Sequence, residues 1–250
     1  MDANIETPAR ALAIGAHPDD IEFGCGGTFA KWAAAGCEIF HLVCTDGSKG
    51  SWDPSTDRSE LVVTRQHEQR AASRALGGKG EVVFLGWPDG ELESGLRQRS
   101  EVCRWIRELR PDVVLGHDPW KRYRIHPDHR NAGFLVTDGV VAARDPHFFP
   151  EQKAAPHRPK AILLFEADEP DHIEDVSGFV DAKIAALLEH RSQLLSTMAI
   201  ETEAAPGAGE DGLDSRQLAA FRAEIAEELA GNGAPHGMPA GELFRMIGDL

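Results

Sequence analysis

The stretch ALAIGAHPDDIEFGCGGT, residues 11–28, decides the fold of this chain. It opens with four apolar residues, the length of a short buried strand, and this strand ends at Gly15. The polar segment HPDD, residues 17–20, follows, and a helical pattern begins at Thr28 and closes at Gly36. In an open α/β sheet, the loop that leaves the carboxyl end of a strand is where ligands bind. An imidazole and two carboxylates are costly to bury together unless a positive group lies between them. This loop therefore predicts a divalent metal site.

Strand-like and helix-like segments alternate through the first two thirds of the chain. Further strands are expected at residues 38–44, 81–85, 112–115 and 161–165, and further helices at 60–76, 96–109 and 129–143. The strands are nearly continuous apolar runs, which fits burial on both faces of a sheet. This alternation predicts the α/β class, with a mostly parallel sheet and helices on both faces.

The C-terminal part of the sequence has a different pattern. Helices are expected at residues 180–195, 217–230 and 241–247, and a segment rich in Gly, Ala and acid, residues 203–214, is expected to be mobile. We expect residues 1–250 to form a single domain, in which a helical extension, residues 179–250, packs on the sheet or on a neighbouring subunit. The mobile segment suggests a lid or a subunit contact, and a homo-oligomer is expected.

The composition excludes several classes of protein. A formal net charge of −15 over 250 residues repels polyanions, so neither nucleic acid nor an anionic membrane is an expected partner. No apolar run approaches the roughly 18 residues of a membrane span. The first ten residues, MDANIETPAR, are polar and acidic, unlike a signal peptide. The four cysteines show no framework spacing, which predicts reduced thiols in a cytoplasmic protein.

Two similar motifs carry the predicted chemistry, HPDD at 17–20 and HPDH at 126–129. Each follows a predicted parallel strand, so the two loops share one edge of the sheet. His17, Asp20 and His129 would then supply two imidazoles and one carboxylate, a usual catalytic zinc set that leaves a fourth position for water. Ferrous iron accepts the same donors, so the set does not fix the metal.

The remaining residues of these motifs have expected roles beside the metal. Asp19 is placed to accept a proton from the metal-bound water. His126, as imidazolium, would stabilise an oxyanion or protonate a leaving nitrogen. Asp128 would hold His126 in the required tautomer. A single HPD or PDD is common in loops, because Pro and Asp form turns; the pairing of the two motifs favours a metal site.

Other residues fit structural roles. His41 lies inside an apolar strand and is expected in the core, as are Trp32 and Trp105 on helical apolar faces. Four further histidines are expected on the surface: His147, His157, His172 and His236. The segment GCGG lacks the full GxGxxG pattern, so it is a weak dinucleotide signal. Its glycines are expected to allow close approach of the backbone.

At HPDDIEFGCGGT (17–28) and HPDHRNAG (126–133) the sequence resembles the PIG-L/LmbE-like family of zinc-dependent N-acetylglucosaminyl deacetylases. The resemblance extends over most of the chain and includes VCTDGSKG (43–50), TRQHEQRAASRALG (64–77), LGWPDG (85–90), RPDVVLGHD (110–118) and HRSQ (190–193). It implies a Rossmann-like fold that binds no dinucleotide. It also implies the site roles, with His17, Asp20 and His129 as zinc ligands, Asp19 as general base and His126 as acid or oxyanion-stabilising residue.

The resemblance extends to substrate contacts. Arg65 and Asp89 match positions that face substrate hydroxyls in sugar-cleaving relatives. Some relatives carry a tyrosine two residues before the first histidine of HPDH. Here Arg124 holds that place and Tyr123 lies one position earlier, so this chain departs from those relatives at the oxyanion site.

Together these features predict a hydrolase that removes an acetyl group from an N-acetylated amino sugar or its conjugate. The closest alternative is an amidase acting on a larger thiol- or amino-acid-linked conjugate. Two alternatives from other classes are a catalytically idle carbohydrate-binding member of the fold and a nucleotide-binding dehydrogenase. The missing glycine fingerprint argues against the dehydrogenase.

A basic segment, WKRYR at 120–124, follows the fourth predicted strand. Lys121, Arg122 and Arg124 place three cations near the predicted metal on an acidic protein. Two interpretations remain open. The segment is a solvated loop, or it binds a small-molecule substrate that carries a phosphate, a carboxylate or an acidic conjugate.

Overall fold

The computed structural model describes residues 1–201 and 213–250. Its strands are β1 (Asp2–Ala3), β2 (Arg10–Gly15), β3 (Glu38–Thr45), β4 (Val82–Trp87), β5 (Val113–His117), β6 (Ala161–Phe165), β7 (His172–Asp175) and β8 (Gly241–Gly248). Its helices are α1 (Asp20–Ala34), α2 (Arg58–Ala75), α3 (Leu96–Leu109), α4 (Pro127–Arg144), α5 (Val180–Leu188) and α6 (Ser215–Gly233), with the short 3₁₀ helices η1 (Arg191–Gln193) and η2 (Ala234–His236).

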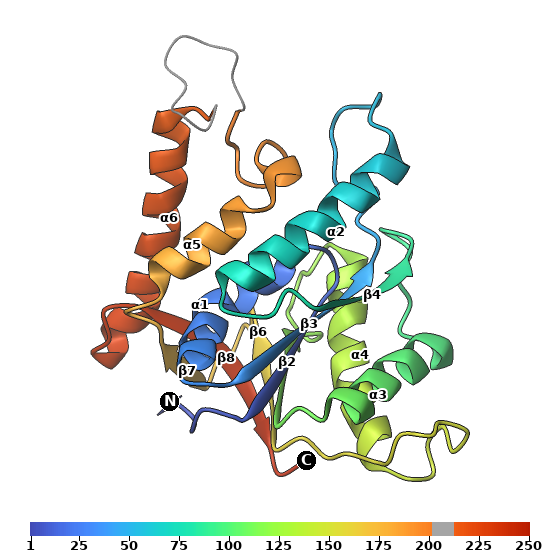
Figure 1. The fold of residues 1–250 in the computed structure, drawn as a ribbon. Coiled ribbons are helices and arrows are strands. Elements are labelled where there is room, and N and C mark those ends of the chain that lie inside the picture. Colours follow the sequence, from blue (N-terminus) through green and yellow to red (C-terminus); the bar gives the residue numbers. More distant parts are fainter. Residues whose placement is uncertain (202–212) are drawn as a thin grey trace.

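The strands of the described residues form one mixed sheet in the order β1-β7-β8-β6-β5-β2-β3-β4. Neighbouring strands are parallel except for β8, which is antiparallel to β6 and β7. Helices α3 and α4 cover one face, and α1, α2 and α5 cover the other (Figure 1). The predicted α/β class, with a mostly parallel sheet covered on both faces, is confirmed.

The central strand β2 shows how the sequence specifies two covered faces. Successive side chains of a strand point to opposite faces of the sheet. Ala11 and Ala13 join the core beneath α1, whereas Leu12 and Ile14 join the core beneath α3 and α4. All four are fully buried. The apolar run therefore contains no outward-facing polar position, as expected for a strand inside a parallel sheet.

The first helix was predicted to begin at Thr28, and this is wrong, because α1 begins at Asp20. The reason lies in the glycine segment, where Cys25 leaves the helical conformation with φ −150° and ψ 23° and interrupts the helix. A Cβ atom at Gly24 would lie 2.6 Å from the ring of Phe165. These glycines lie within the interrupted helix and, as expected, permit close approach.

A buried ion pair joins this interruption to the end of the described chain. The carboxylate of Glu242 in β8 accepts hydrogen bonds from the backbone N–H groups of Gly27 (2.9 Å) and Thr28 (2.7 Å). It also accepts from Lys183 Nζ of α5 at 2.7 Å. Both charged side chains are nearly inaccessible to solvent. Glu242 thus caps the second half of α1 from a distant part of the sequence.

Three expectations for the C-terminal part need correction. Residues 241–247, predicted as a helix, form strand β8, because they pair with both β6 and β7 in the sheet. The helix expected at 180–195 ends at Leu188. His172, expected on the surface, is buried in β7 and contacts Glu174 Oε1 at 2.7 Å. Most of the segment 203–214, expected to be mobile, lies outside the described residues.

The structure also shows where the cysteines and His41 lie and whether any described helix could span a membrane. All four cysteines are buried free thiols, as expected. His41 is fully buried, also as expected. Among the residues that the structure describes, none of the helices combines the length and the apolar character needed to cross a bilayer.

Candidate active site

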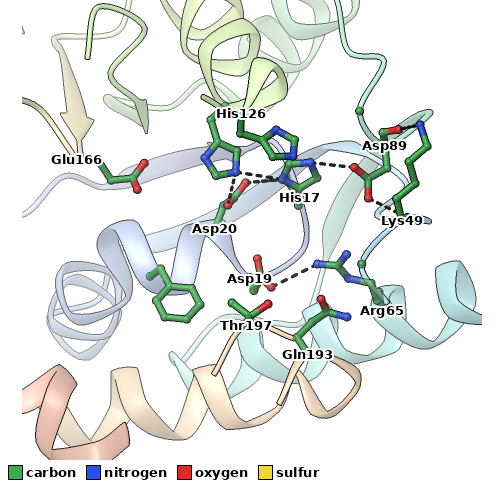
Figure 2. Close-up of a pocket in the computed structure, with 14 residues that line it drawn as sticks. His17, Asp19, Asp20, Lys49, Arg65, Asp89, His126, Glu166, Gln193 and Thr197 are labelled. Carbon is green, nitrogen blue, oxygen red and sulfur yellow. Dashed lines mark hydrogen bonds and ion pairs between the residues drawn. The ribbon is translucent and has the colours of Figure 1, made fainter. Parts of the chain in front are cut away.

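Five neighbouring parallel strands end at one edge of the sheet, and the segments after them line a cavity of about 510 Å³. Figure 2 shows the side chains around it. The loop after β2 and the start of α1 contribute the HPDD residues, and the loop before α4 contributes the HPDH residues. The wall is completed by Phe23, Lys49, Gly50, Arg65, Asp89, Gly90, Glu166, Gln193 and Thr197. Two motifs more than 100 residues apart in sequence therefore meet in one place.

His17, Asp20 and His129 converge on one point of this cavity. His17 Nδ1 lies 3.2 Å from His129 Nε2 and 3.5 Å from Asp20 Oδ2, and His129 Nε2 lies 3.3 Å from Asp20 Oδ1. Two imidazole nitrogens and a carboxylate oxygen this close together form a donor set for a metal ion. The structure thus brings together the three residues predicted as ligands.

The charges around this point favour a cation. Burial disfavours the charged form of His17, but hydrogen bonds to surrounding carboxylates, foremost Asp128, outweigh burial and raise its pKa well above the usual value. Burial, together with neighbouring imidazoles, lowers the pKa of His129 to about 4, so this ring is neutral and able to bind a metal. The carboxylates therefore stabilise positive charge here, which a metal ion would supply.

Asp128 fixes the second ring nitrogen of His17. Its carboxylate lies 3.2 Å from His17 Nε2 and accepts backbone hydrogen bonds from Gly90 (2.6 Å) and Leu92 (3.1 Å). A metal-binding histidine commonly donates its other N–H to a carboxylate held in this way. The geometry therefore assigns the Asp128 carboxylate to His17, rather than to His126 as the sequence suggested.

Sequence reasoning missed two residues, His117 and Glu166, that lie beside the metal point, the place where His17, Asp20 and His129 converge. His117 is buried at the end of β5, with Nε2 3.1 Å from Asp20 Oδ2 and Nδ1 2.8 Å from Glu166 Oε2. The signal available was their position, since each stands at the carboxyl end of a predicted strand, in VVLGH and AILLFE. His117 therefore lies against the Asp20 carboxylate at the end of β5.

His117, His129 and Glu166 also lie close enough together to be considered as a metal site. However, Arg124 occupies that space, because its Nη1 is 2.6 Å from Glu166 Oε2 and 3.1 Å from His129 Nδ1. A guanidinium already supplies the positive charge there. The set of His17, Asp20 and His129 is consequently the better candidate.

Asp19 lies beside the metal point in an unusual conformation. Its φ of 102° is in the left-handed region, which is uncommon for a non-glycine residue and frequent at functional sites. It precedes α1, yet its side chain makes no capping bond. Instead the carboxylate lies 3.3 Å from Arg65 Nη2 (Figure 2). Burial, which outweighs the attraction of Arg65, raises the pKa of Asp19 to about 6, near that of an effective general base.

His126 caps the N-terminus of α4 and faces the cavity. Its Nδ1 accepts the backbone N–H of Asp128 at 3.3 Å, which leaves Nε2 as the protonated nitrogen. Burial, reinforced by the nearby His17 ring, lowers the pKa of His126. This histidine is therefore suited to donate a hydrogen bond as a neutral ring, rather than as the imidazolium expected from the sequence.

The predicted substrate residues divide into two groups. Arg65 and Asp89 line the cavity. Arg122 instead pairs with Asp168 at the exposed surface (3.3 Å), and Arg124 pairs with Glu166 beside the metal point. Neither Arg122 nor Arg124 is among the residues lining the cavity.

Comparison with known proteins identifies the family of this chain. A sequence profile of the family described as PIG-L: GlcNAc-PI de-N-acetylase matches residues 12–140. Over 187 residues the chain is 36% identical to a diacetylchitobiose deacetylase of Thermococcus kodakarensis, covering 74% of this chain and 70% of that protein. The chain belongs to the PIG-L family.

Further relatives of this PIG-L family member extend the comparison. The solved N,N'-diacetylchitobiose deacetylase of Pyrococcus horikoshii superposes with a TM-score of 0.82 at 28% identity, over 96% of this chain and 84% of that one. The chain is also 37% identical, over 148 residues, to a 1D-myo-inositol 2-acetamido-2-deoxy-alpha-D-glucopyranoside deacetylase of Mycolicibacterium paratuberculosis. That match covers 50% of this chain and 48% of the relative. Every residue of the HPDD and HPDH motifs lies within the segment that the PIG-L profile matches.

Proposed function

We propose that this PIG-L family member is a metal-dependent N-deacetylase that removes the acetyl group from an N-acetylated amino sugar or its conjugate. The observation that carries the proposal is the convergence of His17, Asp20 and His129 beside the buried carboxylate of Asp19. The names of two relatives, a diacetylchitobiose deacetylase and a deacetylase of an acetamido-glucopyranoside, support an N-acetylated sugar as the substrate class.

Zinc is the metal that we propose, held by His17, Asp20 and His129. Two imidazoles and one carboxylate with an open position suit catalytic zinc, and Fe²⁺ is the alternative that accepts the same donors. When bound, the ion supplies Lewis acidity, which makes water more acidic and polarises a carbonyl group. His117 and Asp128 hold the ligand side chains in place.

Two side chains beside the metal point have the remaining catalytic roles, which are proton transfer and stabilisation of the developing negative charge. Asp19 accepts the proton of the attacking water and then delivers it to the departing amine. The Nε2–H of His126 donates a hydrogen bond to the carbonyl oxygen as negative charge develops on it. A neutral ring suits this role, because it can donate without first being protonated.

The cavity also holds the groups that we propose to bind the sugar. Arg65 and Asp89 are the proposed contacts to substrate hydroxyls, since both line the cavity. Lys49 stands at the rim, donating its backbone N–H to Asp89 Oδ2 at 2.9 Å. An anionic group on the substrate would meet Lys49 or Arg65, rather than Arg122 and its partner Asp168.

The Asp19→Asn variant tests the proposal, because asparagine tolerates the left-handed backbone but cannot act as the base. With N,N'-diacetylchitobiose as substrate and amine release as readout, we expect kcat to fall by about 10²–10⁴-fold while zinc content stays equal to that of the parent. Asp181→Asn, at an exposed position in α5, is the matched control. Undiminished kcat in Asp19→Asn would refute the role of Asp19. Zinc-independent activity of the parent, or no release of amine from any N-acetyl sugar, would refute the function itself.

A further inference from the structure

One peptide group next to the metal ligands is held from both sides by a single helix. Arg65 and Gln69 lie one turn apart on α2 and so share a face. Arg65 Nη2 donates to the carbonyl oxygen of Pro18 at 2.6 Å, and Gln69 Oε1 accepts the N–H of Asp19 at 3.0 Å. Both backbone atoms belong to the planar peptide that joins Pro18 to Asp19. The helix therefore fixes the plane of this peptide.

The plane of this peptide decides where the Asp19 carboxylate points. The torsion φ of Asp19 describes rotation of the residue relative to the preceding peptide, and here it is 102°. A non-glycine residue persists in this region only when its surroundings hold it there. Without the two hydrogen bonds, the backbone would relax toward a commoner φ and turn the side chain away from the metal point.

The direction of the Gln69 amide is itself fixed by a buried chain of hydrogen bonds. Gln69 Nε2 donates to Glu22 Oε1 at 2.7 Å, and Glu22 Oε2 lies 3.2 Å from His190 Nε2. All three side chains have no solvent exposure. Because the backbone N–H of Asp19 can only donate, the amide oxygen Oε1 must face it, and Nε2 is left to donate to Glu22. His190 begins the HRSQ segment, which the proposed chemistry does not use.

We propose that Gln69, oriented by Glu22 and His190, is a positioning residue that sets the direction of the Asp19 carboxylate. This inference rests on the proposed function, in which Asp19 is the general base. The chain Asp19–Gln69–Glu22–His190 contains no residue of the metal point, so its loss should alter the rate of the chemical step rather than the binding of metal.

The Gln69→Leu variant removes both hydrogen bonds of the amide with little change of size. A small displacement of a reacting group costs about 100-fold in rate, so we expect kcat on N,N'-diacetylchitobiose to fall by about that factor. KM and zinc content should remain those of the parent. Gln66→Leu, at a half-buried position of the same helix, is the matched control and should keep its kcat.

An exchanged pair, Glu22→Gln with Gln69→Glu, separates positioning from packing. The carboxylate at 69 would accept from Asp19 N–H and from the amide at 22, whose oxygen would accept from His190. Every hydrogen bond is thus restored with the charge moved by one position. We expect kcat to recover to within roughly tenfold of the parent, well above that of Gln69→Leu.

Three results would overturn the inference. These are an unchanged kcat in Gln69→Leu, an exchanged pair that folds and binds zinc but stays as slow as Gln69→Leu, and failure of both variants to fold, which would make the network purely structural. If the parent deacetylates and Asp19→Asn does not, these results count against the positioning role alone. An inactive parent counts against the proposed function instead.

Discussion

The Glu242→Leu variant tests how much the contact between Glu242 in β8 and the interrupted helix α1 contributes to the free energy of unfolding. The change removes the acceptor of two backbone N–H groups, those of Gly27 and Thr28. Within residues 1–201 and 213–250, it leaves the buried ammonium of Lys183 with the carbonyl oxygen of Phe23 as its remaining partner. Removing one partner of a buried ion pair costs about 3–5 kcal/mol. For a chain of this size, that free energy corresponds to a fall in Tm of roughly 6–20 °C.

Calorimetry and urea unfolding of the zinc-loaded protein provide the assay. The double variant Lys183→Met with Glu242→Leu carries no buried charge at this point and should regain at least half of the lost free energy of unfolding. The exposed pair of Glu38 and Lys79 has the same 2.7 Å separation, and Glu38→Leu should cost less than about 1 kcal/mol. If Glu242→Leu costs no more than this surface control, the reasoning about the buried cap is wrong.

Three further predictions concern stability and metal affinity. Burial would raise the pKa of Glu174, but hydrogen bonds to His172 and Lys31 outweigh burial and lower this pKa in the folded protein. At acidic pH the unfolded chain therefore binds more protons than the folded one. The stability that Glu174 contributes is complete above the ordinary glutamate pKa and is lost as the pH falls through the lowered pKa of the folded protein. The urea midpoint of Glu174→Gln should accordingly vary less with pH below about pH 5 than that of the parent, and an unchanged profile would contradict the argument. Gly24→Ala brings a Cβ atom to 2.6 Å from Phe165 and should cost about 1–3 kcal/mol in thermal unfolding, where a neutral effect would show that the ring moves freely. His117→Ala should weaken zinc binding about 10–100-fold in a competition titration with a chelator, and an unchanged affinity would mean that His117 does not orient the ligand carboxylate.

Local sequence pattern predicted most of the regular structure, because those elements bury a face that the pattern itself displays. The bounds of α3 and β6 agree with the predicted ranges, residues 96–109 and 161–165. The strand β8 was missed because Leu243, Phe244, Met246 and Ile247 recur at helical spacing. Their extended conformation comes from pairing with β6 and β7, and no local pattern contains that information.

The candidate site was predictable to the extent that motifs follow strands. His17 and His129 could be brought together from sequence, because parallel strands end at one edge of the sheet. Gln69 and Glu22 could not, since each is a polar residue in a helix, where a sequence pattern predicts solvent exposure. Their burial results from the packing of α2 and α5 against α1, which depends on the whole fold.

The sheet order has a consequence for how the molecule is made on the ribosome. Strands β1 and β7 reach the other parallel strands only through β8, yet β8 is the most C-terminal of them in sequence. Until β8 has left the exit tunnel, β1 and β7 can pair with each other but not with the rest of the sheet. The edge of β6 therefore stays unpaired until β8 is available, and completion of the sheet depends on the strand that is synthesised last among those described.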